Sequence, residues 1–394
     1  MFKHLFKMIW NKKKQNSLLI VEILLSFLVI FAVFTFSLNS YDNYAKPMGI
    51  DYQNVWAISY NNTLKTSNGD SLKLFYDNLL NNIKAMPKVI DAAHTSANIP
   101  FSSNHMSTGI TYKGDHIQHI NSFMVDDNYT KTLNAKIVEG RWYNKADIGS
   151  KQELMVINSK LKERMFGKAS AVGKFYENYD GKKKIKVIGV IDNIKFNGDY
   201  QAPEYSMYSH IDTSSYRWLG KILVKVTPDA DAAFESKLYK FMANNLKDSN
   251  IEVEHLSNKL TSYNKFTLVP LIILSIVAAF LIINVALGIF GVLWYNINKR
   301  RGEIGLRRAV GAPGSSVSAQ LVSEAMILAT LSLIIGCFFA IQFPLLNVFD
   351  LAASVYIIAM LLSIVFIYLL VLVCSLYPGR QAAAIYPAVA LHEE

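Results

Sequence analysis

Two long stretches without a single charged residue constrain this chain more than any other feature. No Lys, Arg, Asp or Glu occurs in residues 266–298 or in residues 325–349. Each stretch is long enough for a helix that crosses the ~30 Å hydrocarbon core of a bilayer, which needs about 20 apolar residues. The chain of 394 residues is 52% hydrophobic and only 18% charged, a composition that membrane segments explain better than one oversized soluble core. We therefore predict an α-helical membrane protein.

The apolar segments predict four transmembrane helices, one before and three after a large polar region. The predicted segments are residues 17–44 (first span and stalk), 258–298 (stalk and second span), 317–343 and 351–377, the last ending at Pro378. The first segment should remain as an anchor, because a cleaved signal peptide has an apolar core of only ~7–15 residues and a small-residue cleavage site. The second segment would be about 60 Å long as one helix, twice the hydrocarbon thickness, so its excess should form a stalk outside the bilayer.

The basic residues predict which side of the membrane each part faces. The connector between the second and third spans, residues 299–316, contains five basic residues, whereas the turn between the third and fourth spans, residues 344–350, contains none. Because Lys and Arg are retained in the cytoplasm, we expect the connector, both termini and the tail (residues 378–394) to be cytoplasmic and the large polar region to be extracytoplasmic. The net charge of +10 follows this pattern and does not indicate nucleic-acid binding.

The N-terminus, residues 1–16, combines an apolar stripe with lysines and predicts a short amphipathic helix at the inner interface of the lipid bilayer. The expected anchors in this interface are Phe2, Phe6, Trp10, Lys12, Lys13 and Lys14. The alternative is a disordered basic leader that only sets the orientation of the first span.

The polar region, residues 45–262, has the pattern of a soluble α/β domain. Two strand–helix–strand sets, within residues 45–99 and 219–257, predict a split ferredoxin-like, porter-like subdomain. Its elements are expected at residues 54–60, 70–86 (capped by Asp70 or Ser71), 88–97, 221–227, 229–246 and 251–256. Between the two sets, residues 100–218 predict an inserted β-rich subdomain. Its clearest elements are a strand at 153–158, a helix ending near Gly167 and a hairpin arm at 184–192.

The motifs of catalysis and metal binding are absent or incomplete. Residues 167–174 resemble a phosphate-binding loop, but five residues separate the glycines and Phe175 stands where Ser or Thr is needed. His116 and His119 could share a metal on a helix, whereas in a strand their rings should point to opposite faces and into solvent. We therefore expect no catalytic activity, no cofactor and no metal on this chain.

The connector is the strongest candidate functional segment, because its residues 303–310 can form a two-turn amphipathic helix. Its apolar side chains could fill a groove on a partner, Glu303 could accept a charged hydrogen bond, and its arginines could pair with acidic groups. The alternative is that the basic residues only fix the topology. The candidate coupling residues are Glu303, Ile304, Gly305, Leu306, Arg307, Arg308, Ala309, Val310, Gly311 and Ala312, of which Ile304, Leu306, Ala309 and Val310 are expected to face the groove.

The connector also resembles the E-I-G-x-R-x-A-x-G-A box of the MacB/FtsX-type ABC transporter permeases, read here in residues 303–312. Residues 320–325 are similar to the start of that family's third span and residues 377–391 to its tail. Residues 156–158, 166–167, 172–174 and 187–190 are similar to its periplasmic domain. The joint occurrence of these boxes is specific, although each alone is weak. The resemblance implies a multi-pass permease subunit of a bacterial cytoplasmic (inner) membrane.

The resemblance further implies that two permease subunits, identical or different, pair with a cytoplasmic ABC ATPase dimer and that the connector is the coupling helix. ATP and Mg²⁺ would bind to the ATPases, which we expect on a separate chain because the first span begins near residue 17, as in the LolC/LolE and FtsX arrangement. A periplasmic adaptor and an outer-membrane channel are further candidate partners. The expected function is mechanotransmission that exports or extracts a lipoprotein, peptide, drug or lipid. The alternatives are an FtsX-like signalling subunit that activates a periplasmic or cell-wall hydrolase, and a membrane-anchored binding protein without an ATPase.

Overall fold

The computed structural model describes residues 13–386 except residues 65, 67, 104, 105, 149, 151 and 182, and the side chains of residues 13–16 also lie outside this description. The predicted interfacial helix and its anchors Phe2, Phe6, Trp10 and Lys12 are therefore outside the described residues, as are the side chains of Lys13 and Lys14. The backbone of Lys13 and Lys14 belongs to the helix α2 (Lys13–Tyr44), which thus begins before residue 17, the predicted start of the first span.

The chain divides into two compact units, a membrane unit of residues 1–42 and 268–394 and an outer domain of residues 43–267. The outer domain runs from residue 43 to residue 267, whereas the predicted bounds were residues 45 and 262. At both of its ends, a helix continues without a break into the membrane unit.

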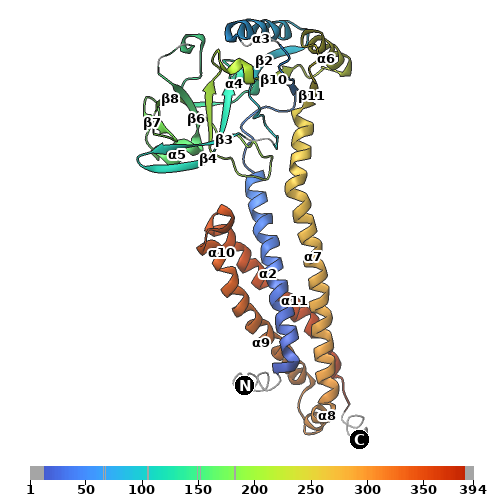
Figure 1. Cartoon of the computed structure of the whole chain (residues 1–394). Helices are drawn as coiled ribbons and strands as arrows, with labels where there is room; N and C mark the ends of the chain where they lie inside the picture. The colour runs from blue at the N-terminus through green and yellow to red at the C-terminus, as the bar shows by residue number, and fades with distance from the viewer. Residues whose placement is uncertain are drawn as a thin grey trace. The chain divides into compact units, whose positions relative to one another are not determined.

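The membrane unit contains, among the described residues, four helices long and apolar enough to cross a membrane. They are α2 (Lys13–Tyr44), α7 (Leu256–Lys299), α9 (Gly314–Ala340) and α11 (Ala353–Ala383), and the short elements α8 (Arg301–Ala309), α10 (Gln342–Leu345) and η3 (Val348–Asp350) connect the last three (Figure 1). The predicted 1+3 arrangement is confirmed, and the second helix, predicted for residues 258–298, is unbroken over 44 residues from Leu256 to Lys299. The third helix begins at Gly314 rather than at residue 317, directly after Pro313.

The core of the membrane unit draws side chains from all four long helices, including Phe27, Val285, Ala329 and Ile367. Small residues permit the closest approaches: a Cβ on Gly336 of α9 would lie 2.5 Å from the Phe27 ring of α2. Membrane helices commonly pack at such small residues, because apolar burial alone does not drive their association in lipid.

The predicted end of the fourth span at Pro378 is wrong, because α11 continues to Ala383. A proline removes one N–H bond from a helix and usually bends it, but this segment also packs against its neighbour. Pro378, Gly379 and Ala382 are buried, and a Cβ on Gly379 would lie 2.8 Å from the Ser318 hydroxyl of α9. Contact with α9 stabilises the helix beyond the proline.

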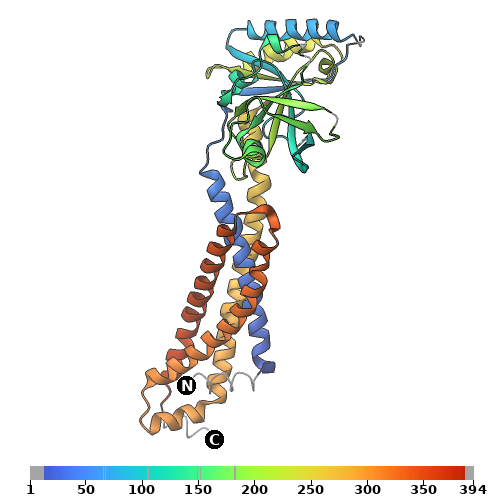
Figure 2. The same ribbon diagram turned by 90° about the vertical axis from the view of Figure 1, so that its left-hand side faces the viewer.

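The outer domain contains the predicted split ferredoxin-like subdomain. Its elements are β1 (Val55–Ser59), α3 (Gly69–Lys84), β2 (Val89–Thr95), β10 (Lys221–Val226), α6 (Ala232–Asn245) and β11 (Glu252–His255). The strands are antiparallel in the order β11-β1-β10-β2, and α3 and α6 cover one face of this sheet (Figures 1 and 2). The cap of α3 is Asn68, which accepts the N–H of Ser71 at 3.0 Å, so the expectation of Asp70 or Ser71 as the cap is wrong.

The inserted subdomain is a closed ring of strands, a feature that the sequence pattern did not predict. Its elements are β3 (Ser107–Tyr112), β4 (Asp115–Val125), α4 (Tyr129–Leu133), β5 (Ile137–Gly140), η1 (Lys145–Asp147), β6 (Leu154–Asn158), α5 (Ser159–Phe166), β7 (Phe175–Asn178), β8 (Lys184–Ile191) and β9 (Ser206–His210), followed by η2 (Ser215–Trp218). The pairings run β4-β3-β7-β8-β6-β9 and return to β4 through a parallel β4–β9 pair. Closure leaves no free edge among these six strands, which protects the subdomain from edge-to-edge association.

Alternate residues of β1 tie the two subdomains together. Trp56 and Ile58 pack in the core that includes residues of α3 and α6, whereas Val55 and Ala57 face a second core shared with Phe123 and other residues of the inserted ring. One strand thus contributes to both cores, and the two subdomains form one compact unit.

Candidate functional site

The connector folds into the helix α8, Arg301–Ala309, at the place that the sequence predicted. The helix ends because Gly311 adopts φ +98°, a left-handed conformation that costs glycine little. The N–H of Gly311 donates to the carbonyl of Arg308 (3.1 Å) and the N–H of Ala312 to that of Arg307 (3.0 Å). This turn satisfies the last carbonyls of α8 and leads at once into α9.

The helix α8 has one face against the membrane unit and one face uncovered. Ile304 is 6% exposed and belongs to the apolar core of the unit, and Gly305 is also buried. Leu306 is 58% and Val310 83% exposed. Of the ten predicted coupling residues, the structure exposes Glu303, Leu306, Arg307, Ala309, Val310 and Gly311, half-buries Arg308 and Ala312, and buries Ile304 and Gly305. The expectation that Ile304 faces a partner is therefore wrong, because its side chain anchors α8 to its own chain.

A closed ring of five polar side chains fixes α8 to α9. Arg300 Nε lies 3.0 Å from Glu303 Oε2, and Arg300 Nη1 lies 3.0 Å from Glu324 Oε1. Arg307 donates to Glu303 and, at 2.9 Å, to Gln320 Oε1. The amide of Gln320 donates to Glu324 at 3.2 Å, which completes the ring.

The ring is strongest at Arg300 and Glu324, whose side chains are only 13% and 11% exposed. The hydrogen bonds that Arg300 donates to Glu303 and Glu324 raise the pKa of its guanidinium. Removing one partner of a shielded pair leaves the other charge without compensation, at a cost of about 2 kcal/mol or more. Any movement of α8 away from α9 must break these bonds.

A second contact joins α8 to the ends of both α9 and α11. A Cβ on Gly314, the first residue of α9, would lie 2.9 Å from Arg308 Nη1 and 2.9 Å from the carbonyl oxygen of Ala383 in α11. The glycine thus permits a close convergence of three helix ends, and Arg308 places a cation beside the C-terminal end of α11, where the helix dipole favours it.

The sequence prediction missed Arg300, Gln320 and Glu324, the residues that hold the predicted helix. Gln320 and Glu324 were noted only as part of a family-like box. A signal was nevertheless present, because Glu324 is the last charged residue before the uncharged stretch 325–349, and such a residue in a span is rarely left unpaired.

A second candidate site lies in the outer domain, where the loop of residues 193–201 holds the outer ends of α2 and α7. We call this segment the collar loop. Lys195 is only 1% exposed, and its Nζ donates to the carbonyls of Asn43 (2.9 Å), Lys46 (2.7 Å) and Asp199 (3.2 Å). Burial lowers the pKa of the Lys195 ammonium, an effect that the Asp199 carboxylate opposes. The buried ammonium of Lys195 thereby caps the C-terminal end of α2.

The same collar loop holds α7 through a reciprocal pair of bonds. Asn264 accepts the N–H of Asp199 at 3.0 Å and donates to its carboxylate at 2.8 Å, and Gln201 donates to Thr267 at 3.2 Å. Gly198, at φ +89°, passes so close that a Cβ would lie 2.6 Å from Asn264 Oδ1. Because the loop directly follows β8, both helices are attached to the inserted ring.

The two motifs rejected above as phosphate and metal sites are part of the regular structure of the outer domain. Gly167 caps α5, and the segment up to Lys174 leads into β7. His116 and His119 are both exposed, as expected, but the opposite-face argument fails: a bulge at His119 (φ +57°) shifts the register and leaves Ile117 and Ile120 both buried. Among the described residues, no group of His, Cys, Asp or Glu could hold a metal.

Comparison with known proteins identifies the family of both units. Residues 18–238 match the family described as MacB-like periplasmic core domain, and residues 275–387 match the family described as FtsX-like permease C-terminal. The first match alone covers more than half of the chain.

Among individual relatives, the chain is 24% identical over 336 residues to the macrolide export ATP-binding/permease protein MacB 1 of Escherichia coli O1:K1 / APEC, covering 82% of this chain and 49% of that protein. It is 24% identical over 230 residues to MacB 1/2 of Paracoccus denitrificans, covering 56% of this chain and 34% of that protein. The chain is also 22% identical to the uncharacterized ABC transporter permease YvrN of Bacillus subtilis, covering 68% of this chain and 69% of that protein. The chain thus spans less than half the length of these two MacB proteins.

Among solved structures, the periplasmic region of MacB from Actinobacillus actinomycetemcomitans is similar, with a TM-score of 0.39 and 14% identity over 55% of this chain and 94% of that one. The first match covers the first span and most of the outer domain, and the second covers most of the three spans that follow. The chain therefore belongs to the MacB/FtsX-type ABC transporter permeases, with transmembrane helices and an extracytoplasmic MacB-like domain.

Proposed function

We propose that this chain is the permease subunit through which a separate cytoplasmic ABC ATPase dimer drives movement of the outer domain, with α8 as the coupling helix. The supporting observation is the division of α8 into a fixed face and an uncovered face. Ile304 and the polar ring hold the helix to α9, while Leu306 and Val310 present apolar side chains to a partner. A displacement of α8 by a docked ATPase must therefore be passed to the spans. ATP and Mg²⁺ would bind to the ATPase.

Transmission to the outer domain would follow α7, which is one continuous helix of 44 residues. A helix is stiff along its axis because each backbone N–H bonds one turn back. At its outer end, Asn264 and Thr267 bond the collar loop, and Lys195 attaches the end of α2 to the same loop. Movement of either helix would therefore pull on the inserted ring.

The proposed complex contains a second permease subunit, either identical or different, in the bacterial inner membrane. Only 6% of the most apolar part of α7 is buried, compared with 22–39% of the corresponding part of the other three spans. Of the four spans, α7 therefore has the largest uncovered surface on which a second subunit could pack. Both termini would lie in the cytoplasm, which the distribution of basic residues supports. A periplasmic adaptor and an outer-membrane channel would be needed where cargo must also leave the periplasm.

The proposed cargo is a lipoprotein, peptide, drug or lipid taken from the membrane or the periplasm. A polar tunnel is difficult to build from the uncharged stretches 266–298 and 325–349, which favours extraction over passage through the bilayer. The macrolide-export names of the relatives favour a drug. An FtsX-like role in activating a periplasmic or cell-wall hydrolase is the second candidate, and the FtsX-like match of residues 275–387 favours it.

The experiment is co-purification of the tagged full chain from its native host in mild detergent, with bound proteins identified by mass spectrometry. An ABC ATPase should co-purify with the wild type and fall at least tenfold in the Leu306→Glu/Val310→Glu variant. Leu74→Glu is the matched control, because Leu74 is similarly exposed (65%) on a helix of the outer domain. Equal ATPase recovery in all three would refute the coupling role. A co-purifying hydrolase without an export partner would favour signalling over transport.

A further inference from the structure

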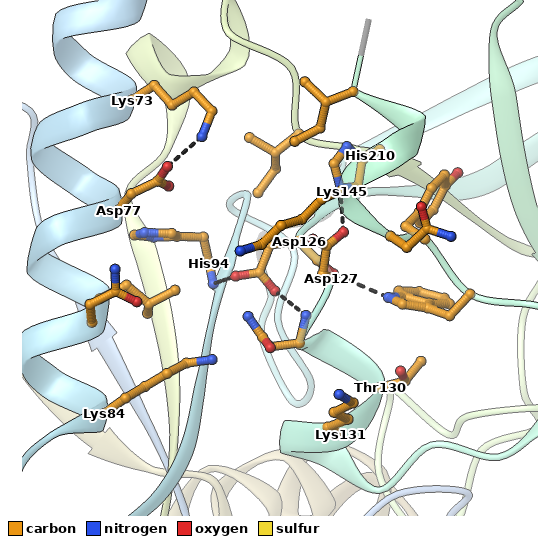
Figure 3. Close-up of a pocket in the computed structure, with 18 of the residues that line it drawn as sticks. Lys73, Asp77, Lys84, His94, Asp126, Asp127, Thr130, Lys131, Lys145 and His210 are labelled. Carbon is orange, nitrogen blue, oxygen red and sulfur yellow. Dashed lines mark hydrogen bonds and ion pairs between the residues drawn. The ribbon is translucent and has the colours of Figure 1, made fainter. Parts of the chain in front are cut away.

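The outer domain contains a cleft of about 880 Å³ between α3 and the segment that carries α4 and η1. This volume lies in the range of small-molecule binding sites, about 300–1,000 Å³. The walls combine charged side chains with aromatic and aliphatic ones, and Figure 3 shows the charged groups converging from α3 and from the opposite wall. The proposed coupling route uses none of these residues.

The carboxylates of the cleft already have partners. Asp77 pairs with Lys73 and accepts the hydroxyl of Tyr216 at 2.8 Å. Asp127 lies 2.8 Å from His210 Nε2. The third carboxylate, at Asp126, accepts backbone N–H groups at 2.8 and 2.9 Å. These carboxylates are therefore poor candidates for binding a cationic ligand.

Two lysines of the cleft, in contrast, have no ion-pair partner within the described part of the chain. Lys131 lies on α4 and Lys145 in η1, both are exposed, and Figure 3 shows Lys145 extending into the cleft. A third lysine, Lys84 of α3, lies on the opposite wall, and its charge is compensated by Asp91 at 2.7 Å. The uncompensated charge of the cleft is positive.

The floor and rim of the cleft supply further features of a binding site. Ile137 and Ile148 line the cleft and remain 39% and 42% exposed, which leaves apolar surface beside the free lysines. His94 is 1% exposed, its Nε2 lies 3.1 Å from the carbonyl of Tyr76, and its Nδ1 has no hydrogen-bond partner among the described residues. Buried polar atoms without a partner are rare in folded proteins, so this nitrogen is a candidate hydrogen-bonding group for a ligand.

The charge of Asp126 opposes an anion only in part at neutral pH. Desolvation raises the pKa of its carboxyl to about 7, against the effect of its two backbone hydrogen bonds. The carboxyl is therefore partly protonated in the range in which a phosphate or carboxylate ligand is charged.

We propose that this cleft binds a small amphiphilic anion, whose phosphate, sulfonate or carboxylate group is held by Lys131 and Lys145 and whose apolar part lies against Ile137 and Ile148. The lining contains lysines and no arginine. Ammonium groups act as point charges without the forked geometry that selects planar carboxylates, so the site selects charge and amphiphilicity more than the shape of the head group. The proposal does not depend on an ATPase or on transport.

The test is isothermal titration calorimetry of the full chain in nanodiscs of zwitterionic lipid, with empty nanodiscs subtracted. Hexyl phosphate is the probe, because its short chain keeps it in water, and hexylammonium and inorganic phosphate are the comparison ligands. We expect saturable binding of hexyl phosphate, with at least tenfold weaker affinity for inorganic phosphate and none for hexylammonium.

The variant Lys131→Gln/Lys145→Gln should weaken hexyl phosphate binding at least tenfold, and Ile137→Ser should weaken it while leaving inorganic phosphate unaffected. The control Lys237→Gln/Lys240→Gln removes two exposed lysines of α6 outside the cleft and should change the affinity less than twofold. The proposal is overturned by absence of hexyl phosphate binding, by equal binding of inorganic phosphate or hexylammonium, or by equal weakening in the control. A thermal melt of each variant that matches the wild type excludes loss of folding as the cause.

Discussion

Replacement of Lys195 by methionine should release the outer end of α2 from the collar loop. Methionine is similar in length and apolar, so Lys195→Met keeps most of the packing and removes the ammonium. In the native domain that ammonium donates to the carbonyls of Asn43, Lys46 and Asp199. The variant removes this donor from all three carbonyls, of which the carbonyl of Asn43 still accepts the N–H of Lys46 at 3.1 Å.

The magnitude follows from the number of bonds and from the burial. A hydrogen bond to a charged group contributes about 1.5–3 kcal/mol, and the three bonds together exceed the desolvation cost that the buried Lys195 imposes and that methionine removes. We take a net loss of about 3 kcal/mol for the local attachment of α2. Since 1.4 kcal/mol corresponds to a factor of ten, local opening should become roughly 100-fold more frequent.

The assay is hydrogen exchange with mass spectrometry on the full chain in detergent, read on peptides that cover residues 39–48. We expect exchange there to accelerate roughly 100-fold in Lys195→Met, with little change in β1 or α6. Lys237→Met, on the exposed face of α6, is the control and should leave residues 39–48 unchanged. An acceleration of less than about threefold would show that the collar loop does not hold α2, and the proposed route to the inserted ring would lose one of its two attachments.

Three further predictions test other parts of the structure. Glu324→Gln should lower the thermal stability of the membrane unit by about 2 kcal/mol, because Arg300 keeps its charge, loses its shielded carboxylate partner and retains only the more exposed Glu303; an unchanged melt would refute the ring. Gly311→Ala should lower the stability of the membrane unit by about 1–2 kcal/mol, because alanine is strained at φ +98°. Gly302→Ala within α8 should instead raise it by roughly 0.5–1 kcal/mol, and equal melting temperatures for the two variants would contradict the proposed turn. Burial lowers the pKa of His94 to about 4, so its contribution to stability is complete above pH 6.5 and is lost as the pH falls. Relative to His94→Gln, the wild type should lose about 3 kcal/mol between pH 6.5 and 4, and parallel pH–stability curves would refute this.

The parts of the fold with local sequence signals were predictable. Uncharged stretches with basic flanks predicted the four spans, and strand–helix–strand periodicity predicted the ferredoxin-like subdomain. Both patterns can be read from the sequence because they depend on residues only a few positions apart. The closed ring was not predictable, since its closing pair joins β4 to β9, about 85 residues later. The end of α11 was wrong for a related reason: Pro378 is a local signal to stop, and contact with Ser318 on another helix overrides it.

The candidate site was predictable as a segment but not as a surface. Charge and spacing located α8, yet an amphipathic helix has two faces, and the sequence does not tell which face packs on its own chain. The structure assigns Ile304 to the membrane unit and leaves Leu306 uncovered. The partners of the ring, Gln320 and Glu324, lie on another helix, so no pattern within the connector could identify them.

Photo-crosslinking from the uncovered face of α8 tests the central claim most directly. A photoreactive phenylalanine analogue placed at Leu306 of the full chain, in the native host, should form an adduct that mass spectrometry identifies as an ABC ATPase, and the same analogue at Leu74 should not. Adducts at Leu306 that contain only lipid or this chain, while the protein is folded and in the membrane, would contradict the account.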